Sequence, residues 1–406
     1  MEKFLILKSP MEVYKDIIEA IPYKGEKEKV TLEKALGKIL AENIYAPENY
    51  PDFSLSTVDG YAVKIRDILG ADLSNPSYLK KKGIINIGEE IKEELKEGET
   101  FEIVTGAMIP RGTEGIVMRE YVRDLGEYVE VFKSISEGEN IFFEGEDIKK
   151  GELILEKGER ISIRNIGVLA SLGIYEVNVY SPIKVHIYSS GDEIIPPYEK
   201  KIKGKVRDIN TFNIISLLSK ENVTLEYKGN LKDDFNIFKS AFEKSLESAD
   251  IIVVSGGSSK SSRDYTEEAI NTLGKPGVIL HGILISPGKP TILGRIDNKY
   301  IFGLPGHPSS CLVVSFLFLL PLIRRLSGKK DIYPKSIYLV LRENVYAKQG
   351  RETYIFGKRD GEFVIPLPTE SPLISSWLKS EGIIKIPLGE EGKEKGEKVE
   401  FFPWEM

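Results

Sequence analysis

The feature of this sequence that most constrains its fold is an alternation of short apolar strands and amphipathic helices from about residue 183 to residue 328. Ile251–Val254 is wholly apolar, as expected for a strand that is buried on both faces of a sheet. This alternation predicts a doubly wound, mainly parallel sheet with helices on both faces. The predicted strands are Lys184–Tyr188, Val223–Tyr227, Ile251–Val254, Val278–Ile285, Thr291–Leu293 and Tyr300–Phe302, and the predicted helices are Asn210–Lys220, Asp233–Leu246, Thr266–Leu273 and Pro308 to about Arg325.

The 406-residue chain is too long for one ordinary domain, and the segments on either side of the α/β region have a different pattern. Short strand-like runs separated by Gly and Pro predict a β-rich domain before it and a small β-barrel after it. The fold class is therefore multidomain α/β plus β. The predicted domains are 1–45 with 143–182 (a discontinuous helical linker domain), 46–142 (β-rich), 183–328 (α/β) and 329–406 (barrel). In the linker domain the predicted helices are Met11–Ala20, Leu32–Ala41 and Ser162–Leu172.

Composition excludes several functional classes. With 56 Lys and Arg against 62 Asp and Glu, the net charge is -6, which argues against nucleic-acid binding. A single cysteine, Cys311, excludes an intramolecular disulfide framework, and the three histidines lack zinc-ligand spacing. The most apolar run, Cys311–Ile323, is about half the length needed to span a bilayer, and Met1–Met11 has no long apolar core. We therefore predict a cytoplasmic protein that binds neither nucleic acid nor membranes.

Three polar, glycine-containing loops follow predicted strands of the α/β domain and mark the expected ligand site. In a doubly wound sheet, ligands bind beyond the carboxyl ends of the strands, where such loops present backbone N–H groups to anions. The loops are Ser189–Glu193, Ser255–Arg263 and Gly303–Ser310. Each loop alone is also consistent with a plain connection, but three on one sheet predict a site for phosphate or another anion.

Acidic residues beside these loops are candidate metal ligands. Asp192, Glu193 and Asp264 carry hard oxygen donors of the kind that hold Mg²⁺ next to phosphate. The structural alternative is a helix cap, because Asp264 has Glu267 at the capping-box spacing. One residue can serve both roles, so both interpretations stay open.

Two further charged residues, Lys289 and Asp59, also have a structural alternative. Lys289 lies in Pro287–Pro290, which would hold it as a fixed charge for an oxyanion, whereas a solvated surface lysine is the simpler alternative. Asp59 precedes Gly60 and by itself predicts a turn. The sequence has no nucleophile elbow, Walker A loop, G-x-G-x-x-G fingerprint or H-E-x-x-H motif, so serine-hydrolase, P-loop and zincin functions are excluded.

Seven segments occur along the chain in an order that resembles one protein family. They are Pro51–Ala62, Thr105–Pro110 with Gly112, Val117 and Glu120, Gly145–Ile148, Gly191–Glu193, Ser255–Gly257 with Asp264 and Tyr265, Pro287–Pro290, and Gly303–Gly306. Over nearly its whole length the chain is similar to the molybdopterin molybdenumtransferases, the family of MoeA and the E domain of gephyrin.

The resemblance implies a specific architecture and reaction. It implies a homodimer with four domains per subunit, a central domain of the MogA/MoaB molybdopterin-binding fold, and a site between that domain and the β-rich domain of the partner subunit. The implied reaction takes adenylylated molybdopterin and molybdate or tungstate, cleaves the adenylate with Mg²⁺, and leaves the metal on the dithiolene. A MogA/MoaB-type adenylyltransferase is the implied partner.

The resemblance also implies roles for individual residues. The catalytic residues would be Asp59, Asp147, Glu193 and Asp264, and the metal ligands would be Asp192, Glu193 and Asp264. The residues that bind the pterin nucleotide or the oxyanion would be Ser190, Gly191, Gly256, Gly257, Ser258, Ser259, Lys289, Pro305, Gly306, Ser310, Arg351 and Ser371.

The sequence departs from the family pattern in the second loop and at three single positions. The family's G-G-V-S-V-G-[DE] loop is here Gly256–Ser262, which lacks the last glycine and the acidic residue, so that Ser261 would occupy a turn that favours positive φ. Phe142 stands where the family often has arginine, Ser286 where lysine is common, and His307 where asparagine or tyrosine is usual.

These departures leave three functional hypotheses. The first is the insertion of molybdate or tungstate into adenylylated molybdopterin. The second is a catalytically impaired paralogue that carries molybdopterin or serves as a protein-binding scaffold. The third is adenylylation of molybdopterin by the α/β domain itself.

Overall fold

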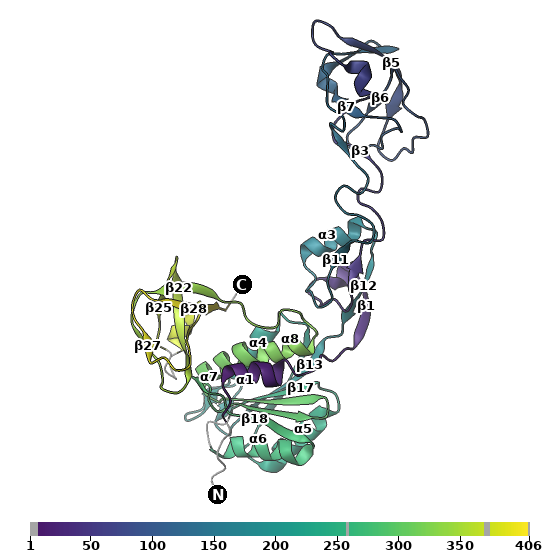
Figure 1. The fold of residues 1–406 in the computed structure, drawn as a ribbon. Helices are drawn as coiled ribbons and strands as arrows, with labels where there is room; N and C mark the ends of the chain where they lie inside the picture. Colours follow the sequence, from purple (N-terminus) through teal and green to yellow (C-terminus); the bar gives the residue numbers. More distant parts are fainter. Residues whose placement is uncertain (1–6, 257–259, 369–373, 405–406) are drawn as a thin grey trace. The chain divides into compact units, whose positions relative to one another are not determined.

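The computed structural model describes residues 7–256, 260–368 and 374–404. The chain forms two compact units (Figure 1). The first holds the α/β domain and the C-terminal barrel, and the second holds the β-rich domain. The first unit comprises Met1–Glu42, Lys157–Ser162 and Glu176–Met406, and the second comprises Asn43–Glu156 and Ile163–Tyr175.

The α/β domain is built on a six-stranded sheet with the order β16-β13-β17-β21-β20-β18. Five of the six strands run in the same direction and β20 runs opposite, pairing antiparallel with both β21 and β18, which confirms the predicted mainly parallel sheet. Ile251, Ile252 and Val253 are fully buried because both faces of their strand are covered. The strands are β13 (Ile183–Ser190), β16 (Val223–Leu231), β17 (Ile251–Gly256), β18 (Pro276–His281), β20 (Ile292–Ile296) and β21 (Lys299–Leu304).

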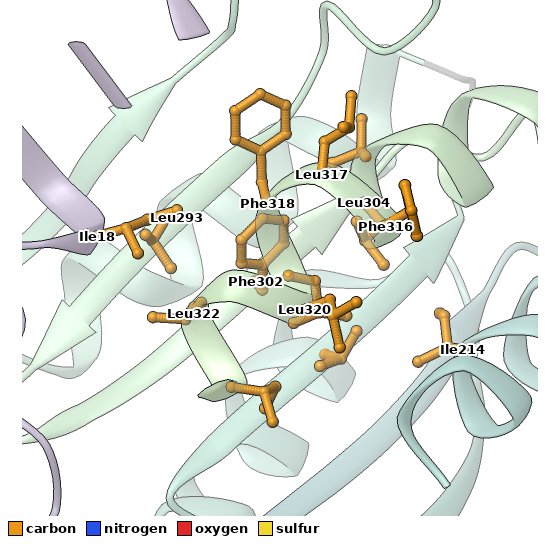
Figure 2. Packing of buried hydrophobic residues seen from close by; sticks show 14 of the residues in the cluster. Ile18, Ile214, Leu293, Phe302, Leu304, Phe316, Leu317, Phe318, Leu320 and Leu322 are labelled. Carbon is orange, nitrogen blue, oxygen red and sulfur yellow. The ribbon is translucent and has the colours of Figure 1, made fainter. Parts of the chain in front are cut away.

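Helices cover both faces of this sheet (Figure 1). On one face Phe302 of the sheet packs with Phe318 and Ile214 of the covering helices (Figure 2). On the other face Phe238 and Phe242 pack against the alternate side chains of the strands. The first face is covered by η1 (Val13–Ile18), α4 (Asn210–Leu218), α7 (Pro308–Val314), η4 (Ser315–Leu319) and α8 (Leu320–Leu326), and the second by α5 (Phe235–Leu246) and α6 (Lys260–Leu273).

The continuous helix Pro308–Leu326 is the most apolar element of the domain. Its 19 residues have a mean hydropathy of 1.7 in the most apolar window, which is enough to cross a membrane by length and composition. In this structure 78% of that window is buried, and Leu317, Phe318 and Leu319 are at most 1% exposed. The segment is therefore a core helix that packs on the sheet, and it confirms the helix predicted from Pro308 to about Arg325.

The C-terminal region is a closed barrel of five strands in the order β24-β25-β22-β28-β26, closed by pairing of β26 with β24. This confirms the predicted small β-barrel. β19 (Ile285–Ser286) pairs in parallel with β24 and so joins the barrel to the α/β domain. The barrel elements are β22 (Ile337–Leu341), β24 (Glu352–Asp360), β25 (Phe363–Pro366), β26 (Gly382–Ile386) and β28 (Lys398–Pro403), with α9 (Ser375–Lys379) and the pair β23 (Val345–Tyr346) and β27 (Gly392–Lys393).

The second unit is built on a six-stranded sheet with the order β7-β4-β6-β5-β9-β8. Tyr61 and Val63 belong to one apolar cluster and Ala62 to another, because successive residues of a strand face opposite sides of the sheet. The sheet strands are β4 (Gly60–Val63), β5 (Ser77–Ile85), β6 (Glu99–Ile103), β7 (Gly115–Met118), β8 (Val122–Asp124) and β9 (Tyr128–Val131). The unit also contains β2 (Ile44–Tyr45), β3 (Leu55–Ser56), β10 (Ile141–Phe142), β11 (Leu153–Leu155), η2 (Ile65–Ile68), η3 (Arg119–Tyr121) and α3 (Ile163–Ser171).

The N-terminal segments confirm one predicted helix and correct another. The helix predicted at Met11–Ala20 forms as α1 (Pro10–Glu12) followed by η1. The helix predicted over Leu32–Ala41 is wrong, because only α2 (Leu32–Ala35) is helical. Gly37 has φ +80°, which ends the helical path, and the apolar residues after it form β-bridges. Near them β1 (Lys27–Thr31) pairs with β12 (Glu176–Tyr180).

Candidate functional site

The carboxyl ends of β13, β17 and β21 form one side of a pocket of about 360 Å³. The strand register places Ser190 beside Gly256 and Ser255 beside Leu304. A short parallel pair, β14 (Ile194–Ile195) with β15 (Val206–Arg207), brings the chain back to the same edge of the sheet. Of the predicted site residues, the structure brings four together around this pocket, namely Ser190, Glu193, Gly256 and Gly306.

Two glycines at this edge are required by their backbone conformation. Gly256 has φ +136°, and a Cβ atom there would lie 2.6 Å from Ser190 Oγ and closer still to the Ser190 carbonyl oxygen. Gly191 has φ +129°, and a Cβ atom there would lie 2.8 Å from the Glu193 carboxylate. Side chains other than glycine rarely adopt these φ values. The two glycines therefore allow the strand ends and the Glu193 carboxylate to approach closely.

Three buried polar side chains that line the pocket have atoms without a hydrogen-bond partner in the described part of the chain. Asp208 accepts a hydrogen bond through Oδ1 from the backbone N–H of Thr211 (3.0 Å), but its Oδ2 is unpartnered. Asn210 donates through Nδ2 to the Gly306 carbonyl oxygen (2.9 Å), while its Oδ1 is unpartnered, as is Ser255 Oγ. These residues are 6%, 8% and 1% exposed in the order Asp208, Asn210, Ser255. Since nearly all buried polar atoms in folded proteins are paired, this cluster indicates a ligand site rich in acceptors.

Asp208 and Asn210 are site residues that the sequence pattern alone does not single out. The only signal is the predicted start of a helix at Asn210, which α4 confirms and which places Asp208 two residues before the helix. An aspartate there has a sufficient structural role in accepting from the first-turn N–H of Thr211, so its second carboxylate oxygen becomes notable only once the fold places it in the pocket. The strand pairing of β14 with β15 is the long-range step that does so.

A group of three carboxylates lies beside the pocket. Asp192 and Glu193 have exposed side chains. Burial, and then the negative charges of Asp192 and Glu193, raise the pKa of Asp233 above its usual range. Asp233 follows β16, and its Oδ1 is buried without a partner in the described part of the chain. Negative charge is therefore concentrated here, although no group of three or more His, Cys, Asp or Glu with metal-binding geometry occurs among the described residues.

A second group of predicted residues, Lys289, Ser310 and Arg351, belongs to the region where the α/β domain meets the barrel. Gly288 packs so closely on α7 that a Cβ atom there would lie 2.5 Å from Val314 Cγ2, one helical turn beyond Ser310. The parallel pairing of β19 with β24 places Ile285 beside Glu352, so Arg351 lies just before β24 and Lys289 just after β19 at this junction. This group offers two cations and a hydroxyl.

Asp59 and Asp147 lie in the second unit. Asp59 Oδ1 accepts hydrogen bonds from the backbone N–H (2.7 Å) and the Oγ1 hydroxyl (2.8 Å) of Thr105. These bonds, with a smaller contribution from the charge of Arg119, hold the pKa of Asp59 below its usual range. The exposed Asp59 carboxylate is therefore ionised and fixed in orientation. Asp147 is exposed, and its backbone N–H donates to the Tyr50 carbonyl oxygen (3.2 Å).

The remaining predicted residues divide into those outside the described part and those placed differently from expectation. Gly257, Ser258, Ser259 and Ser371, with the side chain of Asp264, lie outside the described residues. α6 begins at Lys260, so Asp264 lies inside the helix and its predicted capping role is wrong. Ser261 is also helical, which corrects the expectation of a positive-φ turn there. Gly191, Asp192 and Pro305 adjoin the pocket-lining residues, and the Asp192 carbonyl oxygen accepts from Lys205 Nζ (2.6 Å).

Comparison with known proteins gives matches over nearly the whole chain. Residues 8–173 match the MoeA N-terminal region (domain I and II), residues 186–325 a probable molybdopterin binding domain, and residues 338–404 the MoeA C-terminal region (domain IV). A putative molybdopterin biosynthesis protein of Methanocaldococcus jannaschii is 34% identical over 398 residues, which cover 96% of this chain and 95% of that protein.

Two further similarities connect the chain to a named activity and to a solved structure. A molybdopterin molybdenumtransferase of Haemophilus influenzae is 35% identical over 316 residues, which cover 78% of this chain and 76% of that enzyme. The crystal structure of a molybdopterin biosynthesis MoeA protein from Pyrococcus horikosii superimposes with a TM-score of 0.86 at 33% identity. That superposition covers 98% of this chain and 100% of the crystallised chain.

Proposed function

This chain belongs to the MoeA family of molybdopterin molybdenumtransferases, and we propose that it inserts molybdate or tungstate into adenylylated molybdopterin with Mg²⁺-dependent release of AMP. Membership of this family makes it a transferase of molybdenum cofactor biosynthesis. The observation that carries the substrate assignment is the set of buried, unpartnered acceptors at the carboxyl end of the sheet.

Those acceptors favour a ligand edge that donates hydrogen bonds. Asp208 Oδ2, Asn210 Oδ1 and Ser255 Oγ can each accept, and the Asp208 carboxylate would repel a phosphate. The aminopyrimidinone edge of a pterin carries an amino group and a ring N–H, which are donors. Pairing them with buried acceptors removes the cost of leaving the acceptors unsatisfied. We therefore assign the 360 Å³ pocket to the pterin edge and place the anionic end of the substrate elsewhere.

The cationic group at the barrel junction suits the oxyanion. Lys289 and Arg351 carry positive charge, and Ser310 adds a hydroxyl donor in the first turn of α7, where backbone N–H groups are unpaired. Molybdate and tungstate are tetrahedral dianions of similar size, so this group predicts binding of both. A substrate with a donor edge at one end and anionic groups at the other would then be oriented with the donor edge on the buried acceptors and the oxyanion at Lys289, Ser310 and Arg351.

Mg²⁺ fits the carboxylates beside the pocket. Asp192 and Glu193 are exposed acceptors, and their charges already act on the half-buried Asp233, so a cation there would relieve the repulsion among these carboxylates. Mg²⁺ typically keeps several waters and uses one or two carboxylates with substrate phosphates, so a three-residue cage is not required. Asp192 and Glu193, with Asp264, are the proposed ligands. A bound Mg²⁺ would neutralise charge that develops on a phosphoryl group.

The remaining parts of the proposal rest on the family resemblance and on single residues. Asp59 is ionised and held by Thr105, as a residue that accepts a proton or orients water must be. We assign Asp59, Asp147, Glu193 and Asp264 as the catalytic carboxylates. We also propose a cytoplasmic homodimer that receives its substrate from a MogA/MoaB-type adenylyltransferase, with the domain boundaries given above.

The proposal is tested with Asp208→Asn and its matched control Asp234→Asn. Each carboxylate accepts a hydrogen bond from a backbone N–H in the first turn of a helix, Asp208 from Thr211 (3.0 Å) and Asp234 from Asn236 (2.8 Å), but Asp234 is not among the residues that line the pocket. Asp208→Asn can keep the bond from Thr211 through Oδ1 and would turn a donor toward the pterin edge. We expect it to weaken binding of adenylylated molybdopterin by roughly tenfold or more, because a hydrogen bond to a charged group is replaced by a donor–donor contact.

The readouts are retained pterin after gel filtration and AMP release with Mg²⁺, with and without molybdate or tungstate. We expect oxyanion-dependent AMP release by the unmodified protein and by Asp234→Asn. The proposed function is refuted if the unmodified protein neither retains adenylylated molybdopterin nor releases AMP when either oxyanion is present. Equal pterin retention by both variants would contradict only the assignment of the pterin edge to Asp208.

A second candidate function is a molybdopterin carrier or protein-binding scaffold without insertion activity. It is favoured by Gly256–Ser262, which lacks the acidic residue of the family loop, and by Phe142 and Ser286. The double change Ser261→Gly with Ser262→Asp discriminates the two. A large gain of AMP release over the unmodified protein supports the impaired paralogue, whereas oxyanion-dependent release that needs no restoration supports the insertase.

A further inference from the structure

A second pocket, of about 520 Å³, lies between the α/β domain and the barrel and is not used by the site described above. One wall is α4 and the residues that follow it, together with Leu312 of α7. The other wall is aromatic and consists of Phe356, Trp377 and Trp404 from the barrel. Its volume is within the range of small-molecule sites, about 300–1,000 Å³.

The aromatic wall is rigid. Trp377 Nε1 donates to Ser309 Oγ (3.4 Å), and Trp404 Nε1 donates to Ser380 Oγ (3.1 Å), so each indole is held by a hydrogen bond. The Phe356 ring packs edge-on against both, with centroid distances of 6.3 Å to Trp377 and 6.0 Å to Trp404. With their N–H groups paired, the two indoles, each half-buried, offer mainly apolar ring surface. Such a surface suits a flat aromatic ring.

The helical wall supplies polarity. Asn213 lines the pocket, and its Nδ2 is buried without a hydrogen-bond partner in the described part of the chain. This nitrogen is a donor, whereas the unpartnered atoms in the first pocket can accept. Lys220 lines the same pocket and adds positive charge. A matching ligand is a flat ring with acceptor atoms, attached to an anion.

The two pockets lie along the same two helices. Asn210 and Pro308 line the first pocket, and Asn213 and Leu312, each about one turn further along the same helix, line the second. From Asn210 to Leu217 the axis of α4 rises about 10 Å. The ribose and diphosphate linkage of an adenylylated pterin can span such a distance.

We propose that the 520 Å³ pocket binds the adenine ring of a purine mononucleotide, both as part of the adenylylated substrate and as free AMP. Adenine is flat, stacks on aromatic side chains and carries ring nitrogens that accept hydrogen bonds from an amide such as that of Asn213. The link to the substrate rests on the proposed function, but AMP binding can be measured without it.

The protein contains its own probe, because both of its tryptophans line this pocket. We expect AMP and adenosine to quench the intrinsic tryptophan fluorescence of the full chain, and ribose 5-phosphate to leave it unchanged. Asn213→Asp replaces the amide donor by a carboxylate and should weaken AMP binding about tenfold or more. Asn236→Asp makes the same chemical change at an exposed position on α5, and AMP should bind it as it binds the unmodified protein.

A second variant, at a different residue, tests the pocket in case Asn213→Asp does not fold. Ser216 lines the pocket from an exposed position on α4, so Ser216→Phe can fill the space without disturbing the core. We expect it to abolish the quenching by AMP while the thermal unfolding midpoint stays unchanged.

Two results would overturn the proposal. One is fluorescence that does not respond to millimolar AMP, and the other is an equal AMP response in the unmodified protein, Asn213→Asp and Ser216→Phe. Either result would leave oxyanion-dependent AMP release by the unmodified protein intact and thus the proposed function unharmed. Conversely, AMP binding that obeys these expectations without any AMP release from adenylylated molybdopterin would support the nucleotide pocket and refute the insertase.

Discussion

Replacing Gly256 by alanine should destabilise the α/β domain strongly, because the residue combines a left-handed backbone with a close contact. At φ +136° an alanine has a strained backbone, which costs about 1–3 kcal/mol. Its Cβ would also lie 2.6 Å from Ser190 Oγ and even closer to the Ser190 carbonyl oxygen on the neighbouring strand. Overpacking of this kind costs typically about 1–3 kcal/mol more. The total expected loss is therefore roughly 2–6 kcal/mol in the free energy of unfolding.

Gly229→Ala is a control that separates the two contributions. Gly229 lies in β16 of the same sheet and has φ +109°, but nothing lies within 4 Å of a Cβ atom there. Gly229→Ala should therefore show only the backbone strain, and the difference between the two variants should measure the contact with Ser190. At about 2–4 °C per kcal/mol, that difference of about 1–3 kcal/mol corresponds to roughly 2–12 °C in the unfolding midpoint.

The assay is differential scanning calorimetry of the full chain, with hydrogen exchange of residues 251–256 to assign the transition to this sheet. The unfolding midpoint should be highest for the unmodified protein, lower for Gly229→Ala and lowest for Gly256→Ala. Equal midpoints for the two variants would refute the argument, since the contact between the ends of β13 and β17 would then contribute nothing. Gly256→Ala should also lower pterin retention, because Ser190 and Gly256 both line the 360 Å³ pocket.

Three other predictions follow from buried ionisable groups. Burial and the charge of Lys228 hold the pKa of His186 below its usual 6.5. The contribution of His186 to stability is therefore complete above pH 6.5 and is lost as the pH falls below that value. His186→Gln should flatten the decline of the unfolding midpoint between pH 7 and pH 5. Asp233 has a raised pKa, so its ionisation at neutral pH opposes folding; Asp233→Asn should raise the unfolding midpoint at pH 7 and have little effect near pH 3. The Glu221 side chain is 5% exposed and pairs with Arg324 (2.7 Å) and Lys329 (3.2 Å). Glu221→Gln would leave these two cations unpaired, so it should lower the free energy of unfolding, measured in urea, by about 3 kcal/mol. A change of less than 0.5 kcal/mol for Glu221→Gln, or an unaltered pH profile for either other variant, would contradict the assignment concerned.

The fold was largely predictable because its strongest sequence signals are local. The apolar run Ile251–Val254 and the amphipathic α4 each show their burial in their own periodicity. The failure at Leu32–Ala41 has the opposite cause, since Leu36, Ile39 and Leu40 fit a helical spacing equally well. Gly37 and the long-range bridges of Ile39 to Arg160 and Leu40 to Val179 decide the outcome, and neither can be read from apolar spacing.

The candidate site was predictable only in part, because it is assembled by pairings that are distant in sequence. Loops at the ends of β13 and β17 identified Ser190, Glu193 and Gly256 by position alone. Asp208 and Asp233 were missed because each has an ordinary local setting, the first before α4 and the second before α5. Their significance lies in a buried carboxylate oxygen without a partner, which is a property of the folded environment and has no counterpart in spacing.

One helix connects the three proposed binding elements, and its rigidity determines how they can act together. Pro308 lines the acceptor-rich pocket, Ser310 belongs to the cationic group, and Leu312 lines the aromatic pocket, all within the first two turns of α7. The same helix continues into η4 and α8, whose residues Phe318 and Leu322 are fully buried against the sheet (Figure 2). Because a close-packed core resists small shifts of a buried helix, the three elements must keep a fixed spacing. A ligand that spans all three is then recognised by its length as well as by its chemistry, so a pterin without the nucleotide should lose the aromatic contacts and bind more weakly, with no change in how its edge is held.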